Sequence, residues 1–295
     1  MRRGISSRHS PLLLGAVILL LAGIAFALWP TGTDRTVTTA TAVPSGAARA
    51  EISATDVAAS LPAALPVPPP AASAGYTALA FHDEFDRDSV SLDSSGDGPW
   101  WDGAGTYLGR ENIRIADSVL TLHYDGKHQG GIATAPQSFD KGQAFRYGYF
   151  EARIKFDQVK AAWPAWWLFS LYHMQGKDKV PHGQEWAEWD IFEGDGSVPG
   201  LLITTIHDWV NFKNSQNGNN IHHMNADLSQ WHVYGALAVP GKVTWYFDDK
   251  PFASAAEPAI FGRDAMMLNL SVNDHGGAPP YDMKIDWVRV WQRPR

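Results

Sequence analysis

The sequence predicts an all-β domain over residues 76–295, built as a sandwich or a barrel. Short segments in which apolar and polar residues alternate recur along this region, and Gly, Asp and Asn residues separate them. Alternation with a period of two is typical of strands that bury one face. No segment shows a sustained helical period, so helices are expected to contribute little. Many short strands joined by turns favour two packed sheets or a closed barrel.

Several predicted strands follow one another along the chain. The alternation is clearest in five segments: 119–124, 149–156, 243–247, 267–272 and 285–291. In the second of these, every other residue from Phe150 to Phe156 is apolar and the residues between them are charged. In the fourth, Leu268, Leu270 and Val272 share one face. The third ends in Asp-Asp-Lys, which indicates a hairpin turn.

Residues 1–30 are predicted to be a signal peptide or an N-terminal membrane anchor. Three arginines lie within the first ten residues and precede an uninterrupted apolar stretch from Leu12 to Trp29. This stretch is close to the length that spans a bilayer, and Ala25-Phe26-Ala27 offers a cleavage site. Both alternatives predict export, either as a domain anchored in the inner membrane and facing the periplasm or as a secreted protein.

Residues 31–75 are predicted to be a disordered linker. They are mostly Ala, Pro, Thr, Ser and Val, and the run from Leu61 to Pro70 contains five prolines. Because proline lacks a backbone donor, this run is not expected to form a helix or a central strand. We interpret it as a partly polyproline II tether that would hold the domain away from a membrane.

Composition excludes some classes of function. The formal charge is −7 and no block rich in Lys or Arg follows the first ten residues, so nucleic acid is not an expected partner. The absence of Cys excludes disulfides and a lipoprotein anchor. Of the 13 Trp residues, 12 lie between Trp100 and Trp291, and such rings serve either as core or as platforms for sugars. We expect a monomer.

The segment 185–196 is the strongest functional signal. Glu188, Asp190 and Glu193 lie in a stretch that is otherwise apolar and rich in Trp, Ile and Phe. Carboxylates in such a strand are costly to desolvate unless they are paired or used. In a regular strand the third acid would point away from the first two, but a β-bulge between residues 190 and 193 would bring all three to one face. Two carboxylates facing one cleft suit cleavage of a glycosidic bond.

The chain resembles glycoside hydrolase family 16, which contains laminarinases, lichenases, agarases and carrageenases. Glu188-Trp189-Asp190-Ile191-Phe192-Glu193 matches the E-x-D-x-x-E signature of that family. Four further segments resemble its other strands, in the same order: 81–86, 147–155, 163–167 and 286–291. The resemblance covers residues 78–292. It implies a concanavalin A-like β-jelly-roll sandwich of two curved antiparallel sheets, preceded here by the membrane segment and the linker.

The resemblance also implies roles for the acids. Glu188 would be the nucleophile, Glu193 the general acid and base, and Asp190 the residue that supports Glu188. The family retains the anomeric configuration, which requires an ionised nucleophile beside a protonated acid. Crowding three carboxylates separates their pKa values and lets both states coexist. The alternatives are an acidic edge strand and a carboxylate metal cluster.

Other residues are candidates for sugar binding: Trp163, Trp167, Trp186, Trp209, His207, Arg146 and Asn269. Trp163 and Trp167 match aromatic residues that stack on sugars in the family; packing in the core is the alternative. By alternation, Trp186 lies on the cleft side and Trp189 faces the core. His207 resembles a histidine beside the acids, or else it is a buried structural residue.

Several positions leave specificity open. His182 lies at a cleft rim or in an ordinary loop. The run after Gly276 and Gly277 lacks the Trp that many relatives carry. Many relatives hold one structural Ca²⁺ through an acid of the first strand and one of the last. Glu84 and Asp286 match those positions, or they are plain surface acids. No cofactor is expected for catalysis.

These observations, together with the resemblance to family 16, predict an exported endo-acting, retaining β-glycosidase. A polysaccharide is the expected substrate, a β-1,3-type glucan above others, and the membrane is a partner if the N-terminal segment is not cleaved. Two alternatives remain. The first is a transglycosylase of the same fold that remodels an envelope or extracellular polysaccharide. The second is a non-catalytic carbohydrate-binding module, against which the intact Glu188, Asp190 and Glu193 argue.

Overall fold

A computed structural model describes most of the chain beyond the predicted linker. The described residues are 65–91, 96–102, 110–136, 138, 140–174, 185–210, 213–257 and 265–294, with residues 216–220 described by their backbone only. The predicted signal or anchor segment (1–30), residues 31–64 of the predicted linker, and His182 lie outside them. Among the described residues, no helix has the length and apolar character needed to cross a membrane.

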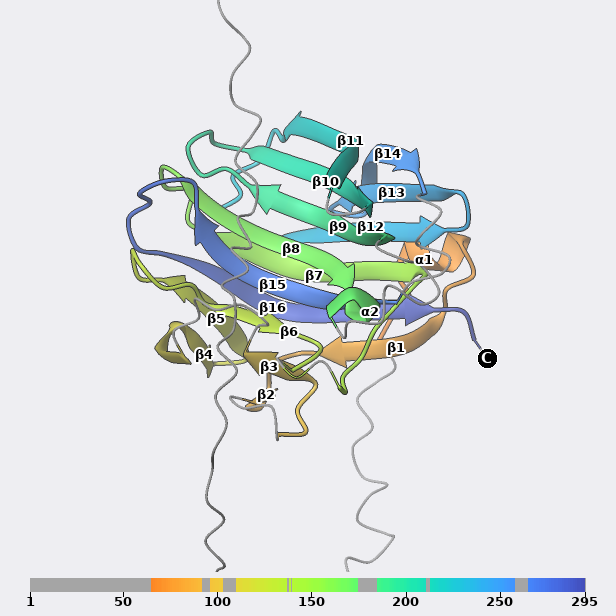
Figure 1. Ribbon diagram of the computed structural model, residues 1–295, viewed down its shortest axis with the longest axis horizontal. Coiled ribbons are helices and arrows are strands. Elements are labelled where there is room, and N and C mark those ends of the chain that lie inside the picture. Colours follow the sequence, from red (N-terminus) through yellow and green to blue (C-terminus); the bar gives the residue numbers. More distant parts are fainter. Residues whose placement is uncertain are drawn as a thin grey trace, which may run out of the picture. The chain divides into compact units, whose positions relative to one another are not determined.

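The described part of the chain folds into two eight-stranded sheets that face one another as curved layers (Figure 1). Sheet A has the order β14-β13-β12-β7-β16-β5-β4, and β1 also pairs with β16. Its strands are β1 (Ala78–Asp83), β4 (Ile113–Ala116), β5 (Val119–Tyr124), β7 (Gly148–Phe156), β12 (His232–Val239), β13 (Lys242–Phe247), β14 (Lys250–Ala256) and β16 (Tyr281–Gln292).

Sheet B has the order β11-β10-β9-β8-β15-β6-β3-β2. Its strands are β2 (Val90–Ser91), β3 (Trp100–Asp102), β6 (Gly131–Ala133), β8 (Ala162–Ser170), β9 (Glu185–Gly194), β10 (Leu201–Val210), β11 (Lys213–His223) and β15 (Met266–Asp274). The short helices are α1 (Pro69–Ser73), η1 (Arg110–Asn112) and α2 (Leu171–Met174). The observed pairings are antiparallel, except that β2 and β3 pair in parallel. The predicted all-β sandwich is therefore confirmed.

The core lies between the two sheets and follows the alternation of the sequence. From sheet A, Phe150 and Ile154 of β7 point inward, and from sheet B, Leu268 and Leu270 of β15 meet them in one cluster. The five predicted strand segments all lie within observed strands. Trp189 packs edge-on against Phe150 at 5.5 Å, across the two sheets. The apolar side chains of each strand point between the sheets, so the opposite, outer face of sheet B is available for a functional site.

The face of sheet A that points away from the core carries a second apolar cluster. Tyr149 of β7 and Trp291 of β16 form this cluster together with Ala71 of α1 and Tyr76. Leu65 also packs against it. The N-terminal segment of the described chain therefore lies on the side of the sandwich that is opposite to sheet B.

The prediction that the linker extends to residue 75 was wrong. Residues 69–73 form a helix, and Pro70 and Ala71 are buried. Proline is tolerated in the first turn of a helix, because its missing N–H would have no partner there and its φ suits a helix. The prolines at the start of α1 thus begin this helix instead of preventing it. The domain includes at least ten residues that composition assigned to the linker.

A pair of substitutions tests the packing of α1. Ala71 is fully buried, whereas the adjacent Ala72 is exposed. Ala71→Asp would bury an unpaired carboxylate, so we expect it to lower the free energy of unfolding by about 2–3 kcal/mol. Ala72→Asp should change it by less than about 0.5 kcal/mol. Thermal or urea unfolding of both variants provides the measurement, and equal stability of the two would show that α1 does not pack on sheet A.

Candidate active site

The acidic strand β9 contains the predicted bulge. On one side, Asp190 pairs with Thr205 and Glu193 with Ile203 of β10, so two residues of β9 face a single residue of β10. On the other side, the register with β8 shifts at the same place. Ile191 and Phe192 both point into the core. Two consecutive inward residues restore the alternation and put Glu188, Asp190 and Glu193 on the outer face of sheet B.

A hydrogen bond across the core supports the bulge. The indole Nε1 of Trp245, on β13 of sheet A, donates to the backbone carbonyl of Asp190 at 3.1 Å, and both groups are buried. A bulge locally disrupts the ladder, and a buried carbonyl without a partner would be costly. Trp245 also packs edge-on against Trp189 at 6.3 Å. The opposite sheet therefore helps to hold the backbone conformation that presents the acids.

Each of the three acids has its own partner. The indole of Trp209, on β10, donates to Glu188 Oε2 at 3.1 Å. The indole of Trp163, on β8, donates to Glu193 Oε1 at 2.8 Å. Between them, Asp190 Oδ2 lies 3.3 Å from His207 Nε2. Two neutral donors and one basic ring thus serve three carboxyls.

His207 connects the acids to the outermost part of sheet B. It stands opposite Glu188 in the β9–β10 register. Its second ring nitrogen, Nδ1, lies 3.1 Å from the side-chain oxygen Oδ1 of Asn214 on β11, which can accept its N–H. Contacts at both ring nitrogens fix the plane of the imidazole. Asn214 was not identified from the sequence, because its segment matches no family motif and only the pairing of β11 with β10 brings it near His207.

Burial sets the protonation of the site. It raises the pKa of Glu188 to about 7 and that of Glu193 to about 8, and the charge of Asp190 adds to both shifts. Burial also raises the pKa of Asp190, and the nearby His207 lowers it in part. Burial alone would lower the pKa of His207, but the charges of Asp190 and Glu188 outweigh it and raise this pKa to about 9. An imidazolium near neutral pH therefore balances part of the acidic charge.

The structure gives the predicted sugar-binding Trp residues different surroundings. Trp167 lies on the outer face of β8 and donates to Ser271 Oγ at 3.2 Å. Trp186 also lies on this face, but it is only 3% exposed. Its ring is stacked between His173 of α2, at 3.8 Å, and Trp209, at 5.9 Å. Alternation predicted the face of the strand on which Trp186 lies, but it could not reveal the rings that cover this face.

Arg146 and Asn269, the other predicted sugar contacts, belong to different sheets. Arg146 is exposed just before β7 of sheet A and makes no hydrogen bond or ion pair with the acids in the described part of the chain. Asn269 lies on the outer face of sheet B, opposite Trp167, but it is 4% exposed. Its amide donates to the carbonyl of Met267 at 3.2 Å. Another missed residue is His275, which stacks on Trp163 with ring centroids 3.4 Å apart.

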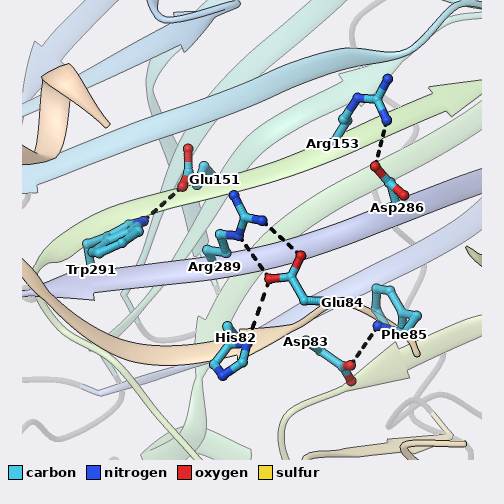
Figure 2. A network of polar contacts seen from close by, with 9 residues as sticks. All are labelled: His82, Asp83, Glu84, Phe85, Glu151, Arg153, Asp286, Arg289 and Trp291. Carbon is cyan, nitrogen blue, oxygen red and sulfur yellow. Dashed lines mark hydrogen bonds and ion pairs between the residues drawn. The ribbon is translucent and has the colours of Figure 1, made fainter. Parts of the chain in front are cut away.

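The residues predicted to hold Ca²⁺ do not fit an ion. Figure 2 shows Glu84 facing Arg289, and Asp286 facing Arg153. Glu84 accepts two hydrogen bonds from Arg289, at 2.9 and 2.8 Å, and Asp286 accepts one from Arg153 at 2.6 Å. The two carboxylates thus have separate guanidinium partners, which supply the positive charge that a metal ion would bring. These pairs join β1, β7 and β16 on the outer face of sheet A.

Comparison with known proteins identifies the family. The family model described as glycosyl hydrolases family 16 matches residues 103–289. The chain belongs to this family. It is therefore classed with the enzymes that hydrolyse O-glycosyl bonds, and E-x-D-x-x-E lies inside the matched region.

Two curated relatives come from Rhizobium meliloti. The endo-1,3-1,4-β-glycanase EglC is 32% identical over 200 residues, and ExsH, of the same description, is 30% identical over 172 residues. The matches cover 60% and 56% of this chain but only 39% and 33% of those proteins. The laminarinase catalytic domain of Thermotoga maritima shares the fold, with a TM-score of 0.57 and 19% identity over 74% of this chain and 99% of that domain.

Family membership also bears on the metal alternative. Ligand atoms of Glu188, Asp190 and His207 lie within 4.8 Å of one another, a spacing that metal ligands share. The donor set alone therefore suits a metal ion as well as a glycosidase. Membership of family 16 favours the glycosidase over the metal centre.

Removal of divalent ions tests the arginine pairs. We expect EDTA to leave the melting temperature unchanged, because Glu84 and Asp286 already have cationic partners. Arg289→Met should lower the free energy of unfolding by about 1–2 kcal/mol, since it removes a bidentate pair and the cation over Trp287. The control Lys284→Met removes a 3.7 Å surface pair and should cost less than about 0.5 kcal/mol. A marked rise of the melting temperature with CaCl₂ would contradict this account.

The pH profile tests the role of His207. The imidazolium lowers the pKa values of Glu188, Asp190 and Glu193, so its loss raises them. For His207→Gln we expect the acidic limb of kcat/KM, which requires ionised Glu188, to move to higher pH. Activity at pH 6 should then fall by about 10-fold more than activity at pH 8. His222→Gln, on β11, serves as a control with an unchanged profile; an unmoved acidic limb in His207→Gln would refute the assignment.

Proposed function

We propose that this chain is an exported, retaining endo-β-glycosidase that hydrolyses a β-linked polysaccharide. The observation that carries this proposal is the placement of Glu188, Asp190 and Glu193 on one face of a bulged strand, each with its own partner. A binding module would have no use for a buried Asp190 between two half-buried glutamates, because removing carboxylates from water is costly. A pair of carboxyls with raised pKa values on one surface is what glycoside cleavage requires.

The first step forms a glycosyl-enzyme. Ionised Glu188 attacks the anomeric carbon, and the bond from that carbon to the leaving oxygen breaks. Protonated Glu193 gives its proton to this oxygen, so the leaving sugar departs as an alcohol. Trp209 holds Glu188 by one oxygen, Oε2, which leaves Oε1 for the attack. Asp190 lies between the two glutamates and, with His207, balances the charge that moves between them.

The second step releases the sugar. Glu193, now ionised, removes a proton from water, and the oxygen of this water attacks the anomeric carbon. The ester bond to Glu188 breaks and both residues return to their starting states. Two inversions at one carbon give net retention. The step needs Glu193 as a base directly after it has acted as an acid, which suits a carboxyl with a pKa near neutrality.

A glucan with β-1,3 bonds is the substrate that we propose. EglC and ExsH are both described as endo-1,3-1,4-β-glycanases. This chain spans less than half of either protein, so their activity supports the proposal without deciding the substrate. The predicted export signal over residues 1–30 agrees with a polymer substrate outside the cell. A cleft that binds internal sugars fits an endo-acting enzyme better than a closed pocket does.

Loss of the nucleophile provides the main test. Glu188→Gln keeps the shape of the side chain but cannot form the ester, so kcat should fall by about 10³-fold or more, with polysaccharide binding retained. Reducing-sugar release from laminarin and mixed-linkage glucan measures the activity, with agarose and carrageenan in the same panel. Glu111→Gln, an exposed residue of η1, is the control. Full activity of Glu188→Gln would remove the nucleophile assignment.

The stereochemistry of the product tests the mechanism. Proton NMR of the first product formed from a cleaved oligosaccharide should show the β-anomer, which then mutarotates. An initial α-anomer would mean inversion and would remove the glycosyl-enzyme from the proposal. The same reaction run at high oligosaccharide concentration reports transfer: products longer than the substrate would indicate that a sugar competes with water for the intermediate.

A further inference from the structure

We propose that Trp163, held in place by His275, positions the acid and base Glu193 and selects which of its oxygens carries the proton. The inference rests on the proposed function, because it concerns the acid step of that reaction. Trp163 would then act through Glu193 and would not serve mainly as a platform for a sugar ring.

The contact between the two residues is direct. The indole Nε1 of Trp163 donates to Glu193 Oε1 at 2.8 Å. An oxygen that accepts this hydrogen bond is the natural site for the lone pair, so the acid proton is directed to Oε2. The free oxygen can then present the proton to the leaving group. Because a glutamate side chain has three rotatable bonds, a fixed donor removes orientations in which this proton points away.

Trp163 is held from two further sides. Its backbone N–H donates to the buried hydroxyl of Tyr281, 3.1 Å away, and this hydroxyl also accepts the N–H of Asn273. The ring of His275 lies flat against the indole, with centroids 3.4 Å apart and an angle of 14° between the planes. One face of the indole is therefore covered, and its N–H is used by Glu193. A sugar could reach only the other face.

The loop that carries His275 is itself well anchored. The backbone N–H of His275 donates to the carbonyl of Ala161, just before β8, at 2.9 Å. The carboxylate of Asp274 accepts the N–H groups of Gly276, at 3.0 Å, and Gly277. Both glycines have positive φ values, 101° and 91°, which other residues rarely adopt. These contacts hold the turn at residues 274–277 in the conformation that places His275 against Trp163.

The charged groups around Glu193 do not replace Trp163 as a donor. Asp190 and Glu188 face it from its own strand and raise its pKa, and His207 faces it from β10 and lowers the pKa. The hydrogen bond from Trp163 lowers the pKa as well. His275 lies behind the indole, and burial lowers its own pKa, which favours the neutral ring. Trp163 is the group that contacts Glu193 with a directed N–H.

Two substrates with different leaving groups test the inference. Mixed-linkage glucan needs a proton on its leaving oxygen, whereas a 2,4-dinitrophenyl β-oligoglucoside does not. The variants are Trp163→Phe, which keeps a ring and loses the N–H, His275→Ala, which removes the stacked ring, and His275→Phe, which keeps it. The measurements are kcat/KM on both substrates and its pH profile. The value of kcat/KM depends on the steps up to formation of the glycosyl-enzyme, so it does not include the later step in which Glu193 acts as a base.

We expect Trp163→Phe to lose about 10- to 100-fold on the glucan and less than about 3-fold on the activated glycoside. In the wild type, the hydrogen bond from Trp163 lowers the pKa of Glu193. The variant lacks this bond, so the pKa of Glu193 should rise and the basic limb of kcat/KM should move to higher pH. His275→Ala should show the same pattern more weakly, and His275→Phe should resemble the wild type. Circular dichroism and thermal unfolding establish that each variant is folded.

Two results separate this inference from the proposed function. Equal losses on both substrates, with an unmoved basic limb, would overturn the positioning role and make Trp163 a sugar platform. A wild-type protein without activity on any polysaccharide of the panel or on the activated glycoside would instead overturn the proposed function.

Discussion

The bulge in β9 is the constraint on which the site depends. Without the extra residue, the strand could place either Glu188 and Asp190 or Glu193 on its outer face, but not all three. The bulge is stabilised from the inside, because Ile191 and Phe192 both enter the core and Trp245 donates to the carbonyl of Asp190. The catalytic face of sheet B is thus held by packing against sheet A. This coupling explains why a site on one surface needs the whole sandwich beneath it.

Trp residues serve this chain mainly as core and as neutral donors. Trp189 and Trp245 fill the space beneath the bulge. Trp209 and Trp163 each donate an N–H to one of the two glutamates that we propose as catalytic. An indole can stabilise a carboxylate without adding a positive charge, so it lowers the pKa less than a Lys or Arg would. A site that must keep one glutamate protonated near neutral pH benefits from such donors.

The sequence predicted on which face of a strand a side chain lies, but not which residues from other parts of the chain contact it. Period-two alternation assigned the inward residues of β7 and β15 and the outward acids of β9, because the side-chain direction in a strand depends only on local geometry. It could not reveal His275 or Asn214, which come from other parts of the chain and meet the site only through strand register. The arrangement of the strands likewise brings Arg289 to Glu84 and Arg153 to Asp286. The linker prediction failed at α1 for a different reason. Pro69 and Pro70 lie in the first turn of this helix, where proline is tolerated.

The two glutamates have different neighbours in the adjacent strands. Glu188 stands opposite His207 on β10, and Glu193 stands opposite Ile203 on the same strand and Ala165 on β8. A basic ring therefore lies beside the residue that must be ionised, and apolar side chains lie beside the residue that must keep its proton. The bulge creates this difference, because an unbroken strand would place Glu193 opposite Leu202, whereas with the bulge it stands one position earlier, opposite Ile203. One extra residue in β9 thus both assembles the acids on a common face and gives them the unequal surroundings that acid and nucleophile require.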